Sequence, residues 1–419
     1  MRRSALGAVA AQGVQALASF VLQVAVAHTI GITGLGGFSI LYGVVVLASG
    51  TITGFVGDSL VVLPRHERAV RSALQQSALI IAAGSGALAA VATTALGFTT
   101  PGEGVAFALA TAAFCLEEVV RRTLMADLHF WRVATIDFVG LLVTLAVVVL
   151  AQVALPLSLA TFLAALAAGQ TVALLVGAAV LPQHERFLAP LTGGSLRTVA
   201  AYGTWRSMQQ LLRPALLTVV RSLVGVMVGL AATGLLEAAR VYVAPALLLV
   251  SGLSSYLFAS FAKQRDRPLR ERLRRSDRSV ALLVAATAVI GIVAVLLLPV
   301  AGPLRFKAHP DLRAVLGWLA YTASIAAVTP YGALAAVGGR QALVFGIRVA
   351  DTAVSLAAVG AGLLAGLDPA WSAALLSIGS LAGGLVIRFV LVPRLAAATP
   401  EAPALGTRAL RPELGTPVP

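Results

Sequence analysis

Twelve apolar stretches, each about 20 residues or longer, follow one another along the chain. A helix needs about 20 apolar residues to cross the roughly 30 Å of hydrocarbon in a bilayer. A segment exposed to lipid must satisfy its own backbone polar groups, which leaves helices or a closed barrel. Barrel strands are shorter and alternate in polarity, unlike these stretches. The sequence, 59% hydrophobic and 11% charged, therefore predicts an all-α polytopic membrane protein. The twelve predicted transmembrane helices are residues 4–27, 38–63, 73–96, 105–125, 133–153, 158–181, 199–230, 235–261, 280–300, 314–337, 342–364 and 371–392.

A segment containing proline, glycine and charges separates six predicted spans from six, between residues 181 and 198. A shift of 200 residues superposes Thr33-Gly34-Leu35 on Thr233-Gly234-Leu235, and each turn opens a long span. Because six is even, both halves enter the membrane in the same direction, as two parallel six-helix repeats. We expect an N-terminal bundle at residues 1–183, a cytoplasmic linker at 184–198, a C-terminal bundle at 199–393 and a disordered cytoplasmic tail at 394–419.

The positive charges are unevenly distributed between the two sides. Twenty of the 31 arginines and lysines lie in loops on the side of the termini, and only Arg305, Lys307 and Arg313 lie in the opposite loops. Loops that carry these residues stay cytoplasmic, which predicts a multi-pass protein of the cell membrane with both termini in the cytoplasm. The basic run at residues 263–278 is interpreted as an orientation signal that touches anionic lipid, not as a nucleic-acid site.

Cysteine and histidine are scarce. Cys115 is the only cysteine and lies in an apolar segment, and the five histidines are scattered. Neither a disulfide framework nor a metal site is expected from such spacings. The sequence therefore predicts no enzyme, no metal and no cofactor, with coupling to H⁺ or Na⁺ left open.

Glycine-rich motifs mark the start of the second span and its counterpart. GITGLGGF at residues 31–38 joins the first two spans, and the second span ends in GDSLVVLPR at residues 57–65. The second half holds RSLVG at residues 221–225, followed by the turn at residues 229–242. These motifs resemble the polysaccharide and lipid-linked oligosaccharide flippase branch of the multidrug/oligosaccharidyl-lipid/polysaccharide (MOP) exporter superfamily. The resemblance implies a V-shaped, MATE-like pair of bundles that moves lipid-linked sugars between leaflets by alternating access. The expected partners are then the bilayer, an anionic lipid-linked glycan and proteins of polysaccharide assembly, without nucleic acid.

The seventh predicted span carries a row of cationic and polar side chains on one side of the helix. At about 100° per residue, Arg213 and Arg221 lie within roughly 80° of Arg206. Charge inside a span costs roughly 2.5–3.5 kcal/mol on insertion scales, so each group needs a partner or a function. The predicted row is Arg206, Gln209, Gln210, Arg213 and Arg221.

Arginine binds phosphate through a planar fork, so the row predicts a cavity for the anionic group of a substrate. Arg240 on the next span is expected to face Arg221 across this cavity, although Glu237 offers it a local partner one turn away. The alternative is that Arg206 snorkels to the interface while Arg213 and Arg221 pair with carboxylates of neighbouring helices.

The first predicted span has a narrow polar stripe of Gln12, Gln15, Ser19 and Gln23. Such a stripe either lines a sugar path or bonds to a neighbouring helix. The two readings are left open. We assign the three glutamines to the candidate substrate site.

The carboxylates within spans are assigned by their nearest cations. Asp58, near Arg65, and Asp351, near Arg348, are candidates for ion coupling, with gating or interfacial anchoring as alternatives. Glu117 and Glu118 precede Arg121 and Arg122 by four residues, which favours structural pairs. Asp137 lies near Arg132 and stays ambiguous.

Three functions are consistent with these features. The leading one is a transporter of lipid-linked oligosaccharide or polysaccharide precursors. The alternatives are a multidrug or major-facilitator exporter of small molecules and, less favoured, a membrane-embedded glycosyltransferase or polymerase. The largest predicted extracytoplasmic loop, residues 302–313, is short for a catalytic site.

Overall fold

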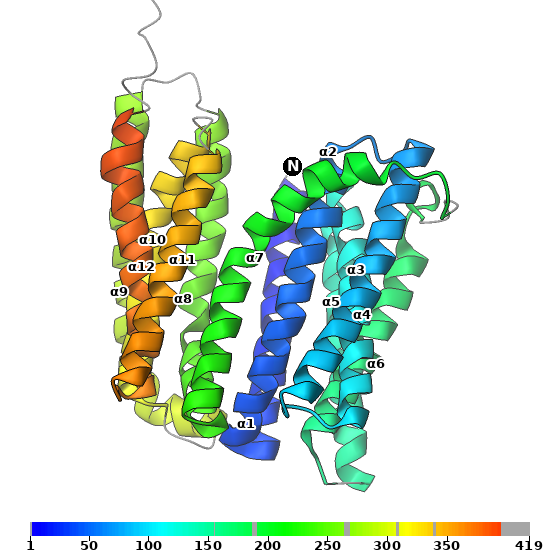
Figure 1. Ribbon diagram of the computed structural model, residues 1–419, viewed down its shortest axis with the longest axis horizontal. Coiled ribbons are helices and arrows are strands. Elements are labelled where there is room, and N and C mark those ends of the chain that lie inside the picture. Colours follow the sequence, from blue (N-terminus) through cyan, green and yellow to red (C-terminus); the bar gives the residue numbers. More distant parts are fainter. Residues whose placement is uncertain are drawn as a thin grey trace, which may run out of the picture.

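The computed structural model describes residues 2–154, 156–186, 191–263, 269–306, 310–337 and 341–394. These residues form helices joined by loops and turns, with no strand among them, which confirms the all-α prediction (Figure 1). The α-helices are α1 (Arg2–Ile52), α2 (Asp58–Val62), α3 (Arg68–Ala95), α4 (Pro101–Ala126), α5 (Phe130–Ala154), α6 (Leu159–Val180), α7 (Leu196–Met227), α8 (Leu230–Lys263), α9 (Leu269–Phe306), α10 (Leu312–Val337), α11 (Gln341–Leu364) and α12 (Ser372–Val386). The shorter elements are the π-helices η1 (Thr53–Gly57) and η4 (Ile387–Leu391) and the 3-10 turns η2 (Gln183–Glu185) and η3 (Pro369–Trp371).

Ten helical stretches of the described chain are long and apolar enough to cross a membrane. The first, Ala10–Val62, has 53 residues. It bends back at Gly31, whose φ of 76° is open to glycine at little cost, so two arms of α1 run in opposite directions (Figure 1). Helix α4, with its charges between Glu117 and Arg122, is not among the ten. The chain is a multi-pass membrane protein, and the count of twelve spans stays a prediction.

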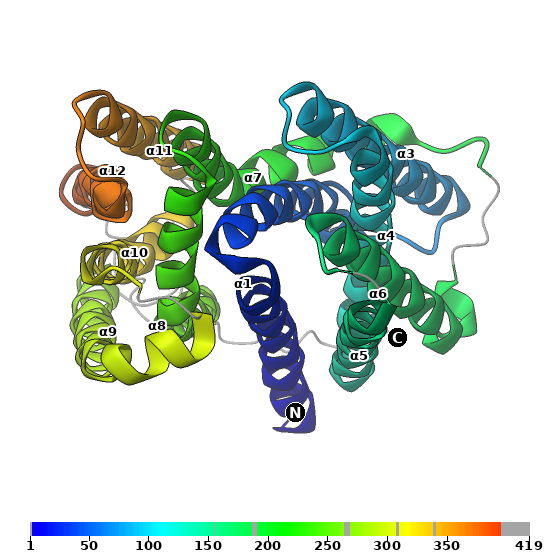
Figure 2. The same ribbon diagram turned by 90° about the horizontal axis from the view of Figure 1, so that it is seen from below.

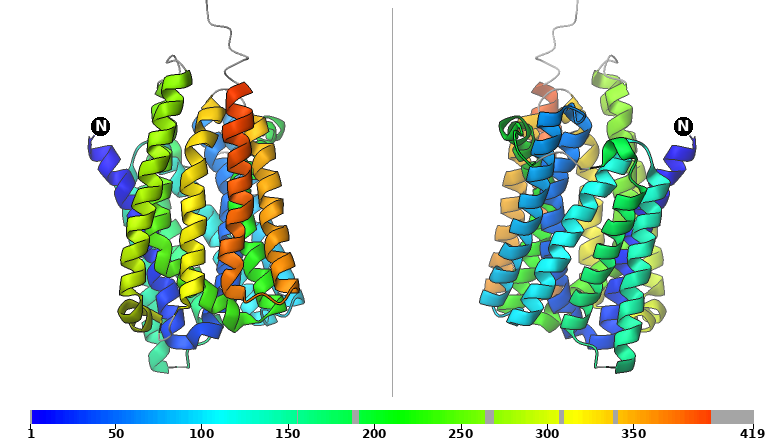
Figure 3. Two further views of the ribbon diagram at one scale, coloured as in Figure 1. Left: turned by 90° about the vertical axis from the view of Figure 1, so that its left-hand side faces the viewer. Right: turned by 90° about the vertical axis from the view of Figure 1, so that its right-hand side faces the viewer.

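The outer surface of the helices is strongly apolar. Leu88, Val153 and Leu296 expose 71%, 86% and 73% of their surface. Exposed apolar area on this scale is unusual for a protein in water, whereas hydrocarbon chains solvate it. In Figure 3 the helices run nearly parallel to one another on both sides of the molecule.

Helices α3 to α6 gather on one side of the molecule and α9 to α12 on the other, with α1 and α7 between them (Figures 1 and 2). Helix α7 begins on the first group, where Ser195 donates its backbone N–H to Ala69 at 3.0 Å. Further along, Trp205 of α7 meets Phe345 of α11 with ring centroids 4.8 Å apart. Helix α7 therefore joins the two groups. The predicted bundle boundaries at residues 183 and 199 stay predictions.

The two turns that repeat at a shift of 200 residues lie against each other. A Cβ added at Gly36 would lie 1.9 Å from the carbonyl oxygen of Leu230, and one added at Gly234 would lie 1.9 Å from that of Ile32. Only glycine fits so close a backbone approach. The second arm of α1 and α8 therefore begin at the same end and run in the same direction, as parallel repeats require.

The basic segment predicted as a loop at residues 263–278 is mostly helical, which corrects that prediction. Helix α9 begins at Leu269, about ten residues before the predicted span. Its first ten residues include five arginines and two leucines, which favour helix in water. Three segments lie outside the described residues. They are residues 264–268, residues 187–190 of the predicted linker, and the predicted disordered tail from residue 395.

Candidate functional site

A cavity of about 280 Å³ lies between the two arms of α1, α7 and α8. It brings most of the polar stripe predicted on the first span together with one predicted arginine of the seventh span and one of the eighth. Among the residues that line it are Gln12, Gln15, Ser19, Tyr42, Thr218, Arg221 and Arg240. We refer to it as the central cavity.

One buried carboxylate holds both arginines of the central cavity. Glu237 Oε2 lies 3.0 Å from Arg221 Nε, and its Oε1 accepts from Arg240 Nε at 2.7 Å. The Glu237 side chain is only 2% exposed, and those of Arg221 and Arg240 are 10% and 18% exposed. The local Glu237–Arg240 pair is confirmed, and Arg221 shares the same partner. Two guanidinium groups against one carboxylate leave a net charge of +1.

Gln23 belongs to the support of the cavity and not to its lining, which corrects its assignment to the substrate site. Gln23 is only 2% exposed, and its side-chain Oε1 accepts from Arg240 Nη2 at 3.3 Å. Its Nε2 donates to Ser19 Oγ at 3.0 Å. Bonds of this kind orient Arg240 toward the cavity.

A second cavity, of about 300 Å³, lies among α7, α10, α11 and α12. Arg213, Gln209 and Tyr321 line it together with Arg348 and Asp351. Arg348 Nη1 donates to Asp351 Oδ2 at 2.9 Å. Arg213 is exposed and makes no ion pair with a carboxylate in the described part of the chain. Arg213, Arg348 and Asp351 together therefore also leave a net charge of +1. Arg213 and Arg221 face different cavities.

Arg206 and Gln210 bind a helix of the first half instead of lining either cavity. Arg206 Nη2 lies 2.7 Å from Asp58 Oδ2, and Gln210 Nε2 approaches the same oxygen at 3.5 Å. Arg206 also donates to Gln209 Oε1 at 2.9 Å. This ion pair fastens α7 to α2. Their assignment to the substrate site is thereby corrected, and the gating alternative for Asp58 is favoured.

The expected neighbour of Asp58, Arg65, has other partners. Its Nη2 lies 2.6 Å from Asp127 Oδ1, and its Nε lies 3.1 Å from Glu185 Oε1. The α2 helix ends at Val62 and the chain then turns, so the helical spacing between Asp58 and Arg65 is lost. The proximity in sequence does not become a contact.

A buried ionic cluster in the first half was not predicted as a unit. The expected pairs of Arg121 with Glu117 and of Arg122 with Glu118 form, at 3.6 and 2.6 Å. Arg121 also pairs with Glu118 and, across helices, with Asp137 at 2.9 Å. The predicted neighbour of Asp137, Arg132, instead donates to the backbone of α6. Counted by residue type, three carboxylates against two guanidinium groups carry a formal charge of −1.

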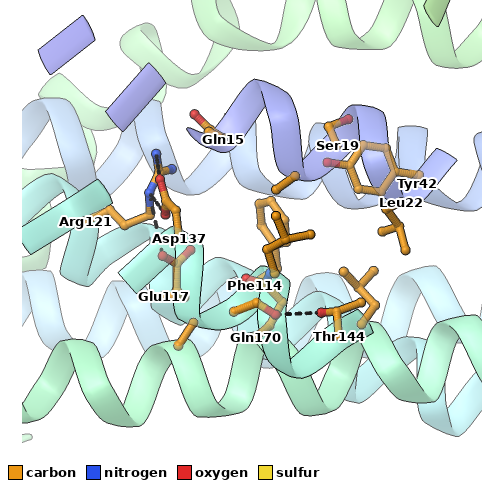
Figure 4. Close-up of a pocket in the computed structure, with 15 residues that line it drawn as sticks. Gln15, Ser19, Leu22, Tyr42, Phe114, Glu117, Arg121, Asp137, Thr144 and Gln170 are labelled. Atoms are coloured by element: carbon orange, nitrogen blue, oxygen red, sulfur yellow. Dashed lines mark hydrogen bonds and ion pairs between the residues drawn. The ribbon is translucent and has the colours of Figure 1, made fainter. Parts of the chain in front are cut away.

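This cluster borders a small cavity of about 60 Å³ within the first half (Figure 4). Figure 4 shows Arg121 between Asp137 and Glu117, with Gln15 and Ser19 on the neighbouring arm of α1. Gln15, Ser19 and Tyr42 line both this cavity and the central cavity. The first arm of α1 therefore separates an acidic chamber from a basic one. The available sequence signal was Asp137 itself, a lone carboxylate in an apolar span.

Solved structures share the fold of this chain despite low sequence identity. An inward-facing multidrug resistance MATE family transporter of the MOP superfamily matches with a TM-score of 0.60 at 13% identity, over 93% of this chain and 98% of that chain. The chain has the fold of these transporters. An outward-facing conformation of a MATE family transporter matches with a TM-score of 0.56 at 12% identity, over 94% and 95% of the two chains.

A third structure with this fold is of a MOP superfamily transporter from Pyrococcus furiosus, for which a reversed polarity of the binding pocket suggests a different function. It matches with a TM-score of 0.60 at 13% identity, over 94% of this chain and 95% of that chain. No protein-family model and no curated sequence matches the chain. The MATE fold agrees with the predicted fold class and differs from the major-facilitator alternative.

Proposed function

We propose that the protein is a membrane transporter that binds the anionic group of a lipid-linked oligosaccharide or polysaccharide precursor in the central cavity, and that the second cavity, lined by Arg213, is a further basic site for the same group. The observation that carries the proposal is the arrangement of Arg221 and Arg240 around the single carboxylate of Glu237. A net charge of +1 beside glutamine and serine side chains suits a phosphate followed by sugar hydroxyls. The pocket of reversed polarity in the Pyrococcus furiosus transporter shows that this fold holds more than one kind of pocket.

Alternating access requires a bond between the halves that opens and closes. The Arg206–Asp58 pair supports this role, because it joins α7 to α2 and both side chains are partly exposed, at 32% and 17%. An ion pair that water can reach is worth little and can break at small cost. We assign Asp58 to gating.

Ion coupling is assigned to Asp351, which lines the second cavity beside Arg213 and pairs with Arg348. An ion that neutralises Asp351 would free Arg348 for an anionic substrate. We predict that Asp351→Asn abolishes the response of transport to an imposed H⁺ or Na⁺ gradient while exchange without a gradient persists. Transport measured with and without the gradient checks this, and a gradient response equal to wild type would refute the assignment.

The test of function is translocation of a labelled lipid-linked oligosaccharide in proteoliposomes. Arg213→Ala and Arg221→Ala are compared with Arg132→Ala, which removes an arginine that, within the described part of the chain, donates to the backbone of α6 at a helix end and pairs with no carboxylate. A charge-assisted hydrogen bond contributes about 1.5–3 kcal/mol, so each cavity variant should lose about ten- to a hundredfold in apparent affinity. Affinities equal to that of Arg132→Ala in both variants would reject the proposal.

A second candidate function is export of small organic cations. It is favoured by the net negative charge of the cluster around Arg121, which borders the small cavity, and by the multidrug exporters that share the fold. Under this function, Glu117→Gln should impair transport of a cationic dye and Arg213→Ala should leave it unchanged. The opposite pattern supports the anionic substrate.

The positive-inside bias places both termini in the cytoplasm of the cell membrane in this proposal. Single cysteines at Glu67 and Asp368 test the orientation, because both residues are exposed and lie at opposite ends of the helices. We expect a membrane-impermeant maleimide added outside cells to label Asp368→Cys only. Labelling of Glu67→Cys alone would invert the topology.

A further inference from the structure

A cluster of imidazole and carboxylate groups lies away from the cavities, where α2, α4 and α6 end. His66 comes from the turn between α2 and α3, and Asp127 caps the end of α4. His184 and Glu185 belong to η2, the short turn that follows α6 and starts the connection to α7. We call these four residues the linker cluster. Neither the proposed transport cycle nor the packing of the bundle uses the histidines.

The donor atoms of the linker cluster are already close together. His184 Nε2 lies 3.7 Å from Asp127 Oδ2 and 3.9 Å from Glu185 Oε1, and His66 Nε2 lies 3.8 Å from Glu185 Oε1. One ligand atom each of Asp127, His184 and Glu185 lie within 4.8 Å of one another. Around one tetrahedral zinc ion with bonds of about 2.0–2.2 Å, donors stand about 3.3–3.6 Å apart. Small side-chain rotations would therefore bring the donor atoms of Asp127, His184 and Glu185 to this spacing, and rotation of the exposed His66 ring would add the fourth ligand.

The two kinds of ligand differ in mobility. The carboxylates are held, with side chains only 17% and 4% exposed for Asp127 and Glu185. The imidazoles are 64% and 67% exposed for His66 and His184, so both rings are free to turn toward an ion. A fixed carboxylate pair with two mobile imidazoles is a donor set that suits a borderline metal such as Zn²⁺.

The charge of the cluster also favours a cation. Arg65 is the cation that pairs with Asp127 and Glu185, so two carboxylates face one guanidinium group and leave a net charge of −1 with neutral imidazoles. Arg65 binds Asp127 Oδ1, whereas Oδ2 faces His184. On Glu185 the same oxygen, Oε1, accepts from Arg65 Nε at 3.1 Å and faces both imidazoles, so a metal ion would bind through Oε2 or replace this bond. The guanidinium repels an ion, but its bonds also orient both carboxylates, as partners behind metal ligands do.

We propose that His66, Asp127, His184 and Glu185 bind one divalent transition-metal ion, with zinc as the preferred chemistry. The ion would tie η2 to the end of α4 and to the turn between α2 and α3. Arg71 already holds the same segment, because its Nη2 donates to the backbone oxygens of His184 and Arg186 at 2.7 Å. The bound metal therefore fastens the start of the connection to α7 onto the first half. Metal binding is measured without transport, so it stands or falls separately from the proposed function.

The test uses full-length, tag-free protein in detergent, stripped with a chelator and titrated with Co²⁺ as a spectroscopic stand-in for zinc. We expect one Co²⁺ per chain, visible ligand-field absorption, displacement by Zn²⁺ and a rise in the melting temperature, because a ligand that binds only the folded state stabilises it. His184→Ala and His66→Ala should each lower the affinity about tenfold or more. His28→Ala removes an imidazole outside the linker cluster, near the end of the first arm of α1, and should bind Co²⁺ like wild type.

Two results would overturn the proposal. One is that wild-type protein, shown to be folded by its cooperative unfolding, gives no Co²⁺ absorption that saturates at one ion per chain. The other is equal binding by the His66→Ala/His184→Ala double variant, which would place the metal elsewhere. Asp127→Asn serves as an independent ligand variant, because an asparagine oxygen can still accept the bond from Arg65. It too should weaken Co²⁺ binding, and unchanged binding in it would count against the site.

Discussion

Glu237 is the group whose loss should be felt most strongly in the second half. Glu237→Gln leaves Arg221 and Arg240 side by side, 10% and 18% exposed, without a carboxylate partner among the described residues. Removing one partner of a buried ion pair costs about 3–5 kcal/mol. We therefore predict that Glu237→Gln lowers the apparent free energy of unfolding by about 3–5 kcal/mol. The bond from Arg240 to Gln23 remains, which favours the lower end of this range.

Removing Arg221 together with Glu237 tests whether the two arginines repel each other when the carboxylate is absent. In the Arg221→Gln/Glu237→Gln double variant only Arg240 remains charged, so the net charge returns to +1 and the repulsion between two arginines disappears. The double variant should therefore be more stable than Glu237→Gln alone. Glu67→Gln is the control, because Glu67 is exposed and surface substitutions change stability by about 0.5 kcal/mol or less.

Tryptophan fluorescence during denaturation in mixed micelles is a suitable assay. Trp318 is buried and donates its Nε1–H to the carbonyl of Leu236 at 2.9 Å, so it reports on α8 beside Glu237. Two outcomes would contradict this prediction. One is that Glu237→Gln is as stable as Glu67→Gln. The other is that the double variant loses as much free energy of unfolding as the Arg221→Gln and Glu237→Gln variants lose together.

Two further predictions concern contacts between the halves. Gly234→Ala should lower the melting temperature, because its Cβ would overlap a backbone oxygen and overpacking costs about 1–3 kcal/mol. Gly37→Ala is the control and should leave the melting temperature unchanged, because its Cβ would have no neighbour closer than 3.8 Å. Equal melting temperatures of the two variants would contradict the close contact at Gly234. Arg206→Asp should repel Asp58 and increase maleimide labelling of a cysteine at Gln12 in the central cavity. Reversing the pair with Asp58→Arg/Arg206→Asp should restore the wild-type labelling rate, and a double variant as open as the single one would argue against the gate.

The elements were predictable because lipid imposes a simple rule on sequence. Each span must be apolar and satisfy its own backbone, so long apolar stretches and the turn at Gly31 could be identified without tertiary information. Helical periodicity also placed Arg221 on a polar face. The exception was the helical start of α9, because hydropathy marks where apolar residues begin and not where a helix does.

Partner choice was harder to predict, because it depends on how each helix is rotated and which neighbour it meets. Glu237 and Arg240 are three apart on one helix, so their bond followed from spacing. The bond from Glu237 to Arg221 crosses from α8 to α7, and that from Asp137 to Arg121 crosses from α5 to α4. Neither pair is visible in helical periodicity. The residues of the row on α7 share a helix but divide among two cavities and an ion pair, because α7 contacts different neighbours along its length.

The basic cavities should serve an anionic substrate, and competition between two substrates in one proteoliposome preparation tests this directly. A labelled lipid-linked oligosaccharide with a pyrophosphate group and a fluorescent organic cation are offered together, with wild type and Arg213→Ala compared. We predict that wild type moves the pyrophosphate-linked glycan, that excess cation does not slow it, and that Arg213→Ala loses most of this transport. Transport of the cation alone, undiminished in Arg213→Ala, would contradict the account.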